Sequence, residues 1–181
     1  MTAPRLPMLP LLGLALLHYA FMLGASGELF VPTVRGMTFN SMALNLLEGR
    51  FDVDPAAIGD EAFERDGRSY AYFGIFPALL RLPLIPWIDL ATTQVEGPYR
   101  LAAMMLAAAG GAWLVRALAA QMPAAASFPA TVLLMAVLFS GPVIMIGTRP
   151  GIYHEVALWG WALAVWFLAL VVPALDPARP P

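Results

Sequence analysis

The sequence predicts an all-α integral membrane protein, on the strength of its composition and of its long apolar stretches. Of the 181 residues, 60% are hydrophobic and only 12% are charged, and the mean hydropathy is +0.74. Soluble domains carry about 25% charged residues. A helix needs roughly 20 apolar residues to cross a bilayer. The chain is therefore long enough for about four transmembrane helices and one large loop.

Charge and cysteine content exclude several classes of function. The chain has 10 basic and 12 acidic residues, giving a formal net charge of −2, so it carries no basic footprint for nucleic acid. Because it contains no cysteine, neither disulfides nor thiolate nucleophiles and metal ligands are available. Membrane lipid is the partner that the composition implies.

The first predicted span covers residues 6–25, and Arg5 immediately before it favours a cytoplasmic N-terminus. A cleaved signal peptide is the alternative, because Gly24-Ala25-Ser26 resembles a small-residue cleavage site. The apolar core is longer than the roughly 7–15 residues usual for a signal. An uncleaved span is therefore the favoured interpretation.

Residues 26–70 follow as a hydrophilic outer loop that holds eight of the 12 acidic residues. Within it, polar and apolar residues alternate at helical spacing over 37–48, and Gly49 follows as a stop. This pattern predicts a short amphipathic helix lying on the membrane surface. The mixed-sign run 60–68 is interpreted as a solvated turn without chemistry, with Asp66-Gly67 as a hairpin tip.

Residues 71–92 are apolar but interrupted by three prolines and by Arg81 and Asp89, which predicts a broken, partly re-entrant helix. Small residues recur every fourth position of the next span, which indicates close helix packing. The remaining spans are predicted at 99–120, 128–146 (with a kink at Gly141-Pro142) and 153–172, before a tail, 173–181. Counted from a cytoplasmic N-terminus, the loop 26–98 and the turn 147–152 share the outer face of one membrane domain.

Two carboxylates in the outer loop are candidates for chemistry. Asp52 and Asp54 stand at alternate positions before Pro55, which favours extended backbone, so both side chains can face the same way. Such a pair can hold a divalent cation, bind a sugar or act as a general base. A solvated acidic loop is the simpler alternative. Glu28, just beyond the first span, is a further candidate acid or base.

The run before the last span is a candidate phosphate-binding site. Arg149 precedes a helix whose first turn presents free N–H groups and a partial positive charge. Tyr153, His154 and Glu155 would lie at the same helix end, where they can hold a headgroup or transfer a proton. In the alternative interpretation Arg149 extends to the interface and Glu155 interacts with the helix dipole.

Aromatic residues gather in 69–77 around a glycine, and Tyr72 is the one we single out. Aromatic faces suit sugar rings and lipid headgroups. Anchoring of the loop to the bilayer explains the same residues equally well.

Three motifs together resemble the bacterial membrane glycosyltransferases of GT-C type, which take a sugar from a polyprenyl-phosphate donor. They are the helix end NLLEGRF (45–51), GRSYAYFGIFPALLRLPL (67–84) and TRPGIYHEVALWG (148–160). The resemblance implies the N-terminal portion of such an enzyme, acting at the outer face of the bacterial inner membrane. Arg149 would hold the donor phosphate, and Tyr72 and Tyr153 would shape the sugar pocket.

The chain departs from the family at one position that matters. Family members carry a catalytic aspartate between the first span and the amphipathic helix, but Val34-Arg35-Gly36-Met37 contains no acid. The base would then be Asp52, Asp54 or Glu28, or it would be missing altogether, as in a truncated or inactive form. The departure also favours an alternative function, a non-enzymatic membrane subunit that binds lipid or a partner protein.

Overall fold

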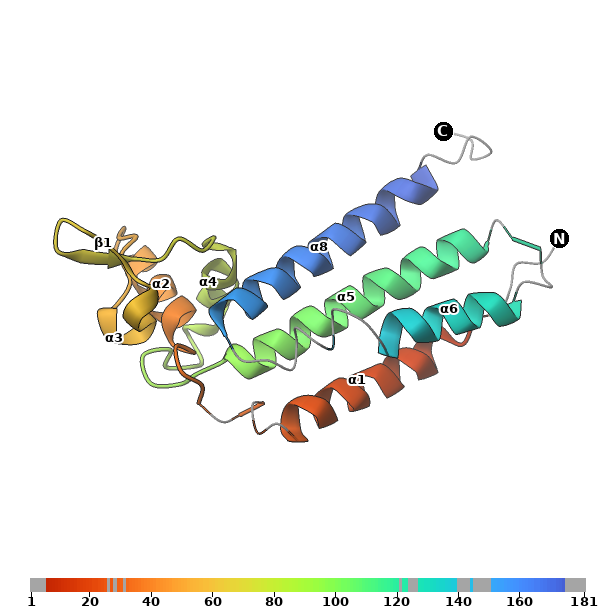
Figure 1. Ribbon diagram of the computed structural model, residues 1–181, viewed down its shortest axis with the longest axis horizontal. Coiled ribbons are helices and arrows are strands. Elements are labelled where there is room, and N and C mark those ends of the chain that lie inside the picture. The colour runs from red at the N-terminus through yellow and green to blue at the C-terminus, as the bar shows by residue number, and fades with distance from the viewer. Residues whose placement is uncertain are drawn as a thin grey trace.

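The computed structural model of the protein describes residues 6–25, 27, 29–30, 32–120, 122–123, 127–139, 144 and 151–174. The described chain has two parts, a bundle of helices and a small lobe packed at one end of it (Figure 1). The lobe is built mainly from the segment between the first and second long helices. It holds most of the polar side chains considered below.

Four helices form the bundle: α1 (Met8–Ala25), α5 (Glu96–Ala119), α6 (Ser127–Phe139) and α8 (Ile152–Ala174). Within the described residues, α1, α5 and α8 are the helices long and apolar enough to cross a membrane. They match the predicted spans 6–25, 99–120 and 153–172 to within three residues at each end. The fold is thus mostly helical with three membrane-length helices in the described residues, and the predicted count of four spans stays a prediction.

The third predicted span is described only in part. Helix α6 has 13 residues, which corresponds to about 20 Å of the roughly 30 Å hydrocarbon thickness. The predicted kink at Gly141-Pro142 lies outside the described residues. In Figure 1, α1 and α6 run toward the lobe and α5 and α8 run away from it, which is the alternation that successive passes require.

Helix α5 is the central member of the bundle and packs against α8, α6 and α1 (Figure 1). Its small residues allow this close approach, as the sequence spacing predicts: Ala103, Ala107 and Gly111 are all buried. A Cβ atom added at Gly111 would lie 2.5 Å from Cγ1 of Val137 in α6, so a larger residue would require Val137 to shift. Between α1 and α6, the buried Tyr19 hydroxyl donates to the carbonyl oxygen of Leu138 at 2.5 Å.

The lobe contains short elements around a second hydrophobic core. They are α2 (Thr38–Leu47), α3 (Pro55–Ile58), η1 (Gly59–Glu61), β1 (Phe63–Arg65), β2 (Arg68–Tyr70), α4 (Phe76–Arg81) and η2 (Leu82–Leu84). The strands pair antiparallel, and their connecting residues Asp66 and Gly67 both have positive φ, +52° and +73°. That backbone defines the tight hairpin turn predicted for Asp66-Gly67, which is therefore confirmed.

The amphipathic helix predicted over 37–48 is confirmed as α2, which ends at Leu47 before Gly49. Its expected place on the membrane surface stays a prediction, although part of its apolar face is covered by protein. Phe39, Met42 and Ala43 are buried against other lobe residues, including Val53 and Ile58. Amphipathic spacing shows that one face is covered but does not distinguish cover by lipid from cover by protein.

The break predicted in the segment 71–92 is confirmed, and its partly re-entrant course stays a prediction. Helix α4 ends at Arg81, and η2 continues it for three residues around Pro83. Proline removes a backbone donor and clashes with the preceding turn, so the helix cannot extend further. The segment lies against α2 and α8, where the lobe meets the bundle.

Candidate functional site

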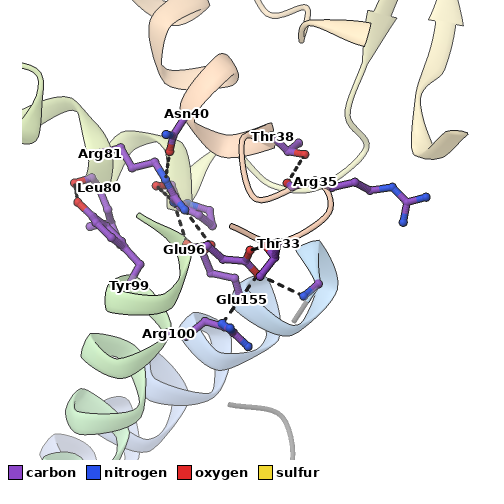
Figure 2. A network of polar contacts seen from close by, with 12 residues as sticks. Thr33, Arg35, Thr38, Asn40, Leu80, Arg81, Glu96, Tyr99, Arg100 and Glu155 are labelled. Carbon is purple, nitrogen blue, oxygen red and sulfur yellow. Dashed lines mark hydrogen bonds and ion pairs between the residues drawn. The ribbon is translucent and has the colours of Figure 1, made fainter. Parts of the chain in front are cut away.

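A buried ion pair joins the lobe to the bundle. Arg81, at the end of α4, and Glu155, in the first turn of α8, are both fully buried. The guanidinium donates from Nη1 and Nη2 to the two carboxylate oxygens of Glu155, each at 2.8 Å (Figure 2). This bidentate geometry is the strongest form of such a pair.

The remaining polar atoms of the pair are also satisfied. Arg81 Nε donates to Oδ1 of Asn40 at 2.9 Å, and Nη1 also donates to the Pro77 carbonyl oxygen at 2.9 Å. Asn40 in turn donates to the carbonyl oxygens of Leu90 and Thr93, at 3.0 and 2.7 Å. The network thus ties α2, α4 and α8 together with the chain after η2.

Aromatic rings enclose the Arg81 guanidinium. Its central carbon lies 4.7 Å from the ring centroid of Tyr99 and 5.3 Å from that of Phe39. Such cation–π contacts stabilise the positive charge of the guanidinium, and they are stronger here because Arg81 is buried. Glu155 was predicted to bind substrate, but here both of its carboxylate oxygens are taken by Arg81 and neither faces an opening.

A second buried carboxylate lies beside this pair (Figure 2). Glu96, at the start of α5, accepts from the Thr33 hydroxyl and from the backbone N–H of Gly151, the latter at 3.2 Å. Its Oε1 atom also lies 3.8 Å from Nε of Arg100. Glu96 therefore connects the chain that follows the first span to the start of α8, as the predicted shared face requires.

Two of the predicted sugar-binding residues come together on the surface of the lobe. The hydroxyl groups of Tyr72 and Tyr153 contact each other, and both donate to Oε2 of Glu61, at 2.8 and 2.5 Å. The Phe73 ring lies beneath them, with its centroid 5.0 Å from that of Tyr153. The hydrogen bond from Tyr153, and then that from Tyr72, lowers the pKa of the Glu61 carboxyl below its ordinary value.

The stretch 34–37, where the resembled family has an acid, carries a cation here instead. Arg35 is paired with Asp60, and its Nη1 lies 3.9 Å from Oε1 of Glu61. The hydrogen bond from Arg35 lowers the pKa of the Asp60 carboxyl. The mixed-sign run 60–68 was interpreted as a solvated turn, yet its Asp60 and Glu61 join these residues into one polar cluster.

The carboxylates Asp52 and Asp54 line a cleft of about 530 Å³ in the lobe. Both were predicted to face the same way, and both contribute to the wall of this one cleft. Its other lining residues come from α2, α3 and neighbouring chain and are Met37, Ser41, Leu44, Asn45, Arg50, Val53, Pro55, Ala56, Ala57, Leu90 and Ala91. The mixture of hydroxyl, amide, guanidinium and apolar groups suits a small polyol.

Asp52 is the more enclosed of the two carboxylates, with 14% of its side chain exposed. Its Oδ2 accepts from Nη1 of Arg50 at 2.7 Å, and Nη1 of Arg68 lies 3.9 Å from Oδ1. Oδ1 is buried and accepts no hydrogen bond from any residue that the structure describes. The neighbouring charge of Arg68 compensates this oxygen in part, and because the atom is buried it is not exposed to a ligand in the cleft.

Asp54 and Arg50 have structural duties beside the cleft. Asp54 is exposed and caps α3, because its Oδ1 accepts from the Ala56 N–H at 2.8 Å. Arg50 donates to Glu48 as well as to Asp52, and the Glu48 hydrogen bond is the main cause that raises the pKa of Arg50. Arg50 also holds Oδ1 of Asn45 at 2.7 Å, which fixes the guanidinium at the cleft wall.

Within the described ranges, no group of three or more histidine, cysteine, aspartate or glutamate side chains is arranged to hold a metal ion. A divalent cation at Asp52 and Asp54 stays a prediction. Its remaining ligands would be other groups than histidine, cysteine, aspartate or glutamate side chains of the described residues. His154 is half-buried beside Gly151, and its Nδ1 lacks a hydrogen-bond partner among the described residues. Glu28 and Arg149 lie outside the described residues.

Sequence reasoning missed the roles of Arg81, Asn40, Glu96 and Glu61. A usable signal existed for Arg81, because a charged residue inside an apolar run needs a partner. Comparisons of this chain with protein-family models, with curated proteins and with solved structures find no match in any of the three.

Proposed function

We propose that the protein is a glycosyltransferase of GT-C type that takes a sugar from a polyprenyl-phosphate donor at the outer face of the cytoplasmic membrane. The acceptor would bind in the lobe cleft. The observation that carries this proposal is the polar cleft of about 530 Å³ in the lobe, whose wall includes the carboxylates Asp52 and Asp54 and the guanidinium of Arg50. An acceptor hydroxyl in this cleft would lie beside a carboxylate that can take its proton.

The chemistry assigned to Asp52 is that of a base. Its carboxylate takes the proton of the acceptor hydroxyl as the hydroxyl oxygen bonds to the anomeric carbon of the donor sugar. The bond from that carbon to the phosphate oxygen breaks, and the polyprenyl phosphate leaves with the electron pair. Arg50 and Asn45 hold Asp52 in position through its carboxylate and its carbonyl oxygen, respectively.

The cluster of Tyr72, Tyr153 and Glu61 on the surface of the lobe supports a role in binding the donor sugar. Both tyrosine rings are exposed, and their hydroxyl groups are fixed by a carboxylate that also has capacity for sugar hydroxyls. The short segment of α3 and η1 links this cluster to the cleft, since Ala57 lines the cleft and Glu61 follows four residues later.

The test is transfer in membrane vesicles that contain the full chain. Tritiated polyprenyl-phosphate pentoses and hexoses serve as donors, and label is measured in the aqueous and lipid products. Asp52→Asn keeps the shape but removes the basic oxygen, and we expect a loss of about 10²–10⁴-fold in rate. Asp66→Asn, at the exposed hairpin tip, is the matched control and should leave the rate unchanged.

Transfer that persists undiminished in Asp52→Asn would rule out the assigned base. A wild-type chain that transfers none of these sugars, although it is folded in the membrane, would instead favour the non-enzymatic membrane subunit.

A further inference from the structure

The surface of the lobe between Ile75 and Ile88 is apolar although the segment is not enclosed by protein. The one charged residue in these 14 positions is Arg81, and its side chain is fully buried in the pair with Glu155. Large apolar side chains point outward instead: Phe76 is 39% exposed, Leu79 42% and Trp87 80%. Exposed apolar side chains of this kind are typical of a surface that contacts lipid or another protein.

The position of this surface along the bundle suggests what the occupant is. The Phe76 ring lies 6.0 Å from the ring of Trp159, seven residues after the first residue of α8. Seven residues of helix correspond to about 10 Å along the axis. The hydroxyl of Tyr99, in the first turn of α5, donates to the carbonyl oxygen of Leu80 at 2.7 Å. Helix α4 thus lies beside the first turns of two membrane-length helices.

Helix α8 carries further exposed apolar side chains beyond the level of Trp159, including Trp161 and Phe167. On the lobe side the apolar run ends at Asp89, whose carboxylate accepts from the Ala91 N–H at 3.0 Å and from the Thr92 hydroxyl at 2.8 Å. The polar chain therefore resumes immediately beyond the segment.

We propose that the segment 75–88 inserts into one leaflet of the bilayer and binds phospholipid at the boundary between headgroups and acyl chains. Phe76 and Leu79 lie against the acyl chains, and Trp87 takes the interfacial position that tryptophan favours. The Arg81 charge faces the protein, so burial of the outer face in lipid leaves no unpaired charge. In this proposal the membrane-surface element is α4 with η2 rather than α2, part of whose apolar face protein already covers.

This inference does not depend on the proposed transferase activity, and the chain offers a direct test. Because it contains no cysteine, a single cysteine can be introduced and spin-labelled without first replacing native cysteines. Leu79→Cys and Trp87→Cys report on the segment, in vesicles of phosphatidylethanolamine and phosphatidylglycerol. Phe63→Cys, an exposed apolar position in the hairpin, is the aqueous control, and Phe167→Cys in α8 is the lipid control.

We expect both segment labels to be accessible to oxygen and shielded from a water-soluble nickel chelate, as at position 167. Nickel accessibility equal to that of position 63 would overturn the proposal. Shielding of both segment labels from oxygen as well as nickel would also overturn it, because a protein partner would then cover the segment. Two reporter positions keep the result interpretable if one variant fails to fold.

Discussion

Glu155 is the single residue on which the junction between lobe and bundle depends most. It supplies both acceptors for a fully buried guanidinium that is held by α4 and α2 as well. The net contribution of a buried pair is modest, but removing one partner leaves an uncompensated charge. The sensitivity of this site to mutation is therefore much larger than its contribution to stability.

Glu155→Gln should lower the free energy of unfolding by about 3–5 kcal/mol, because Arg81 then stays buried without a counter-charge. Denaturant unfolding in detergent, followed by circular dichroism, measures this loss. Asp66→Asn removes an exposed carboxylate and serves as the control. The double variant Arg81→Met with Glu155→Leu should recover most of the loss. An equal, small effect of Glu155→Gln and of the control would contradict this role.

Single residues were predictable only where their chemistry is local. The alternate spacing of Asp52 and Asp54 is a property of neighbouring residues, and both line the same cleft. The pairing of Arg81 with Glu155 spans 74 positions, and no periodicity connects them. Glu61 belongs to a run whose mixed charges are typical of a solvated turn, so only the fold reveals its contact with two tyrosines.

At the scale of elements, the small residues of α5 determine how closely the bundle packs. Gly111 lies against Val137 of α6. A Cβ atom added at Gly160 of α8, in contrast, would meet no other side chain or backbone within 4 Å. These two helical glycines form a matched pair that differs in surroundings.

Gly111→Ala should destabilise the bundle by about 1–3 kcal/mol, because its methyl group would overlap Val137. Gly160→Ala should be neutral or slightly stabilising, since alanine is the better helix former. Thermal unfolding of both variants in the same detergent compares them. A Gly111→Ala protein as stable as Gly160→Ala would show that α5 and α6 do not pack as described.

The elements themselves were largely predictable from spacing and breakers. The length of the apolar stretches predicts α1, α5 and α8. Proline predicts the break after Arg81, and Asp66-Gly67 predicts the hairpin turn. What covers each apolar face was not predictable. The face of α2 and the outer face of α4 have similar side chains, and only their positions relative to the bundle separate them.

At the scale of the whole molecule, the lobe and the first turn of α8 form one assembly at one end of the bundle (Figure 1). The contacts of Glu96 with Thr33 and Gly151, and of Tyr72 with Tyr153, join segments that four successive passes would bring to one face. Counting spans from the sequence predicted this shared face, because the side on which a loop lies depends only on whether the number of preceding spans is odd or even. How the clusters contact each other and how deeply their charges are buried could be learned only from the fold.

The central claim is that the candidate site lies on one membrane face and that the bundle carries the chain to the other. Labelling of single cysteines with a membrane-impermeant maleimide tests it, using Arg65→Cys in the hairpin and Met122→Cys just beyond the far end of α5. The cysteine at position 65 should react in intact spheroplasts, and that at position 122 only after permeabilisation. Reaction of both from the same face would contradict a membrane-spanning α5 and, with it, the proposed outer-face site.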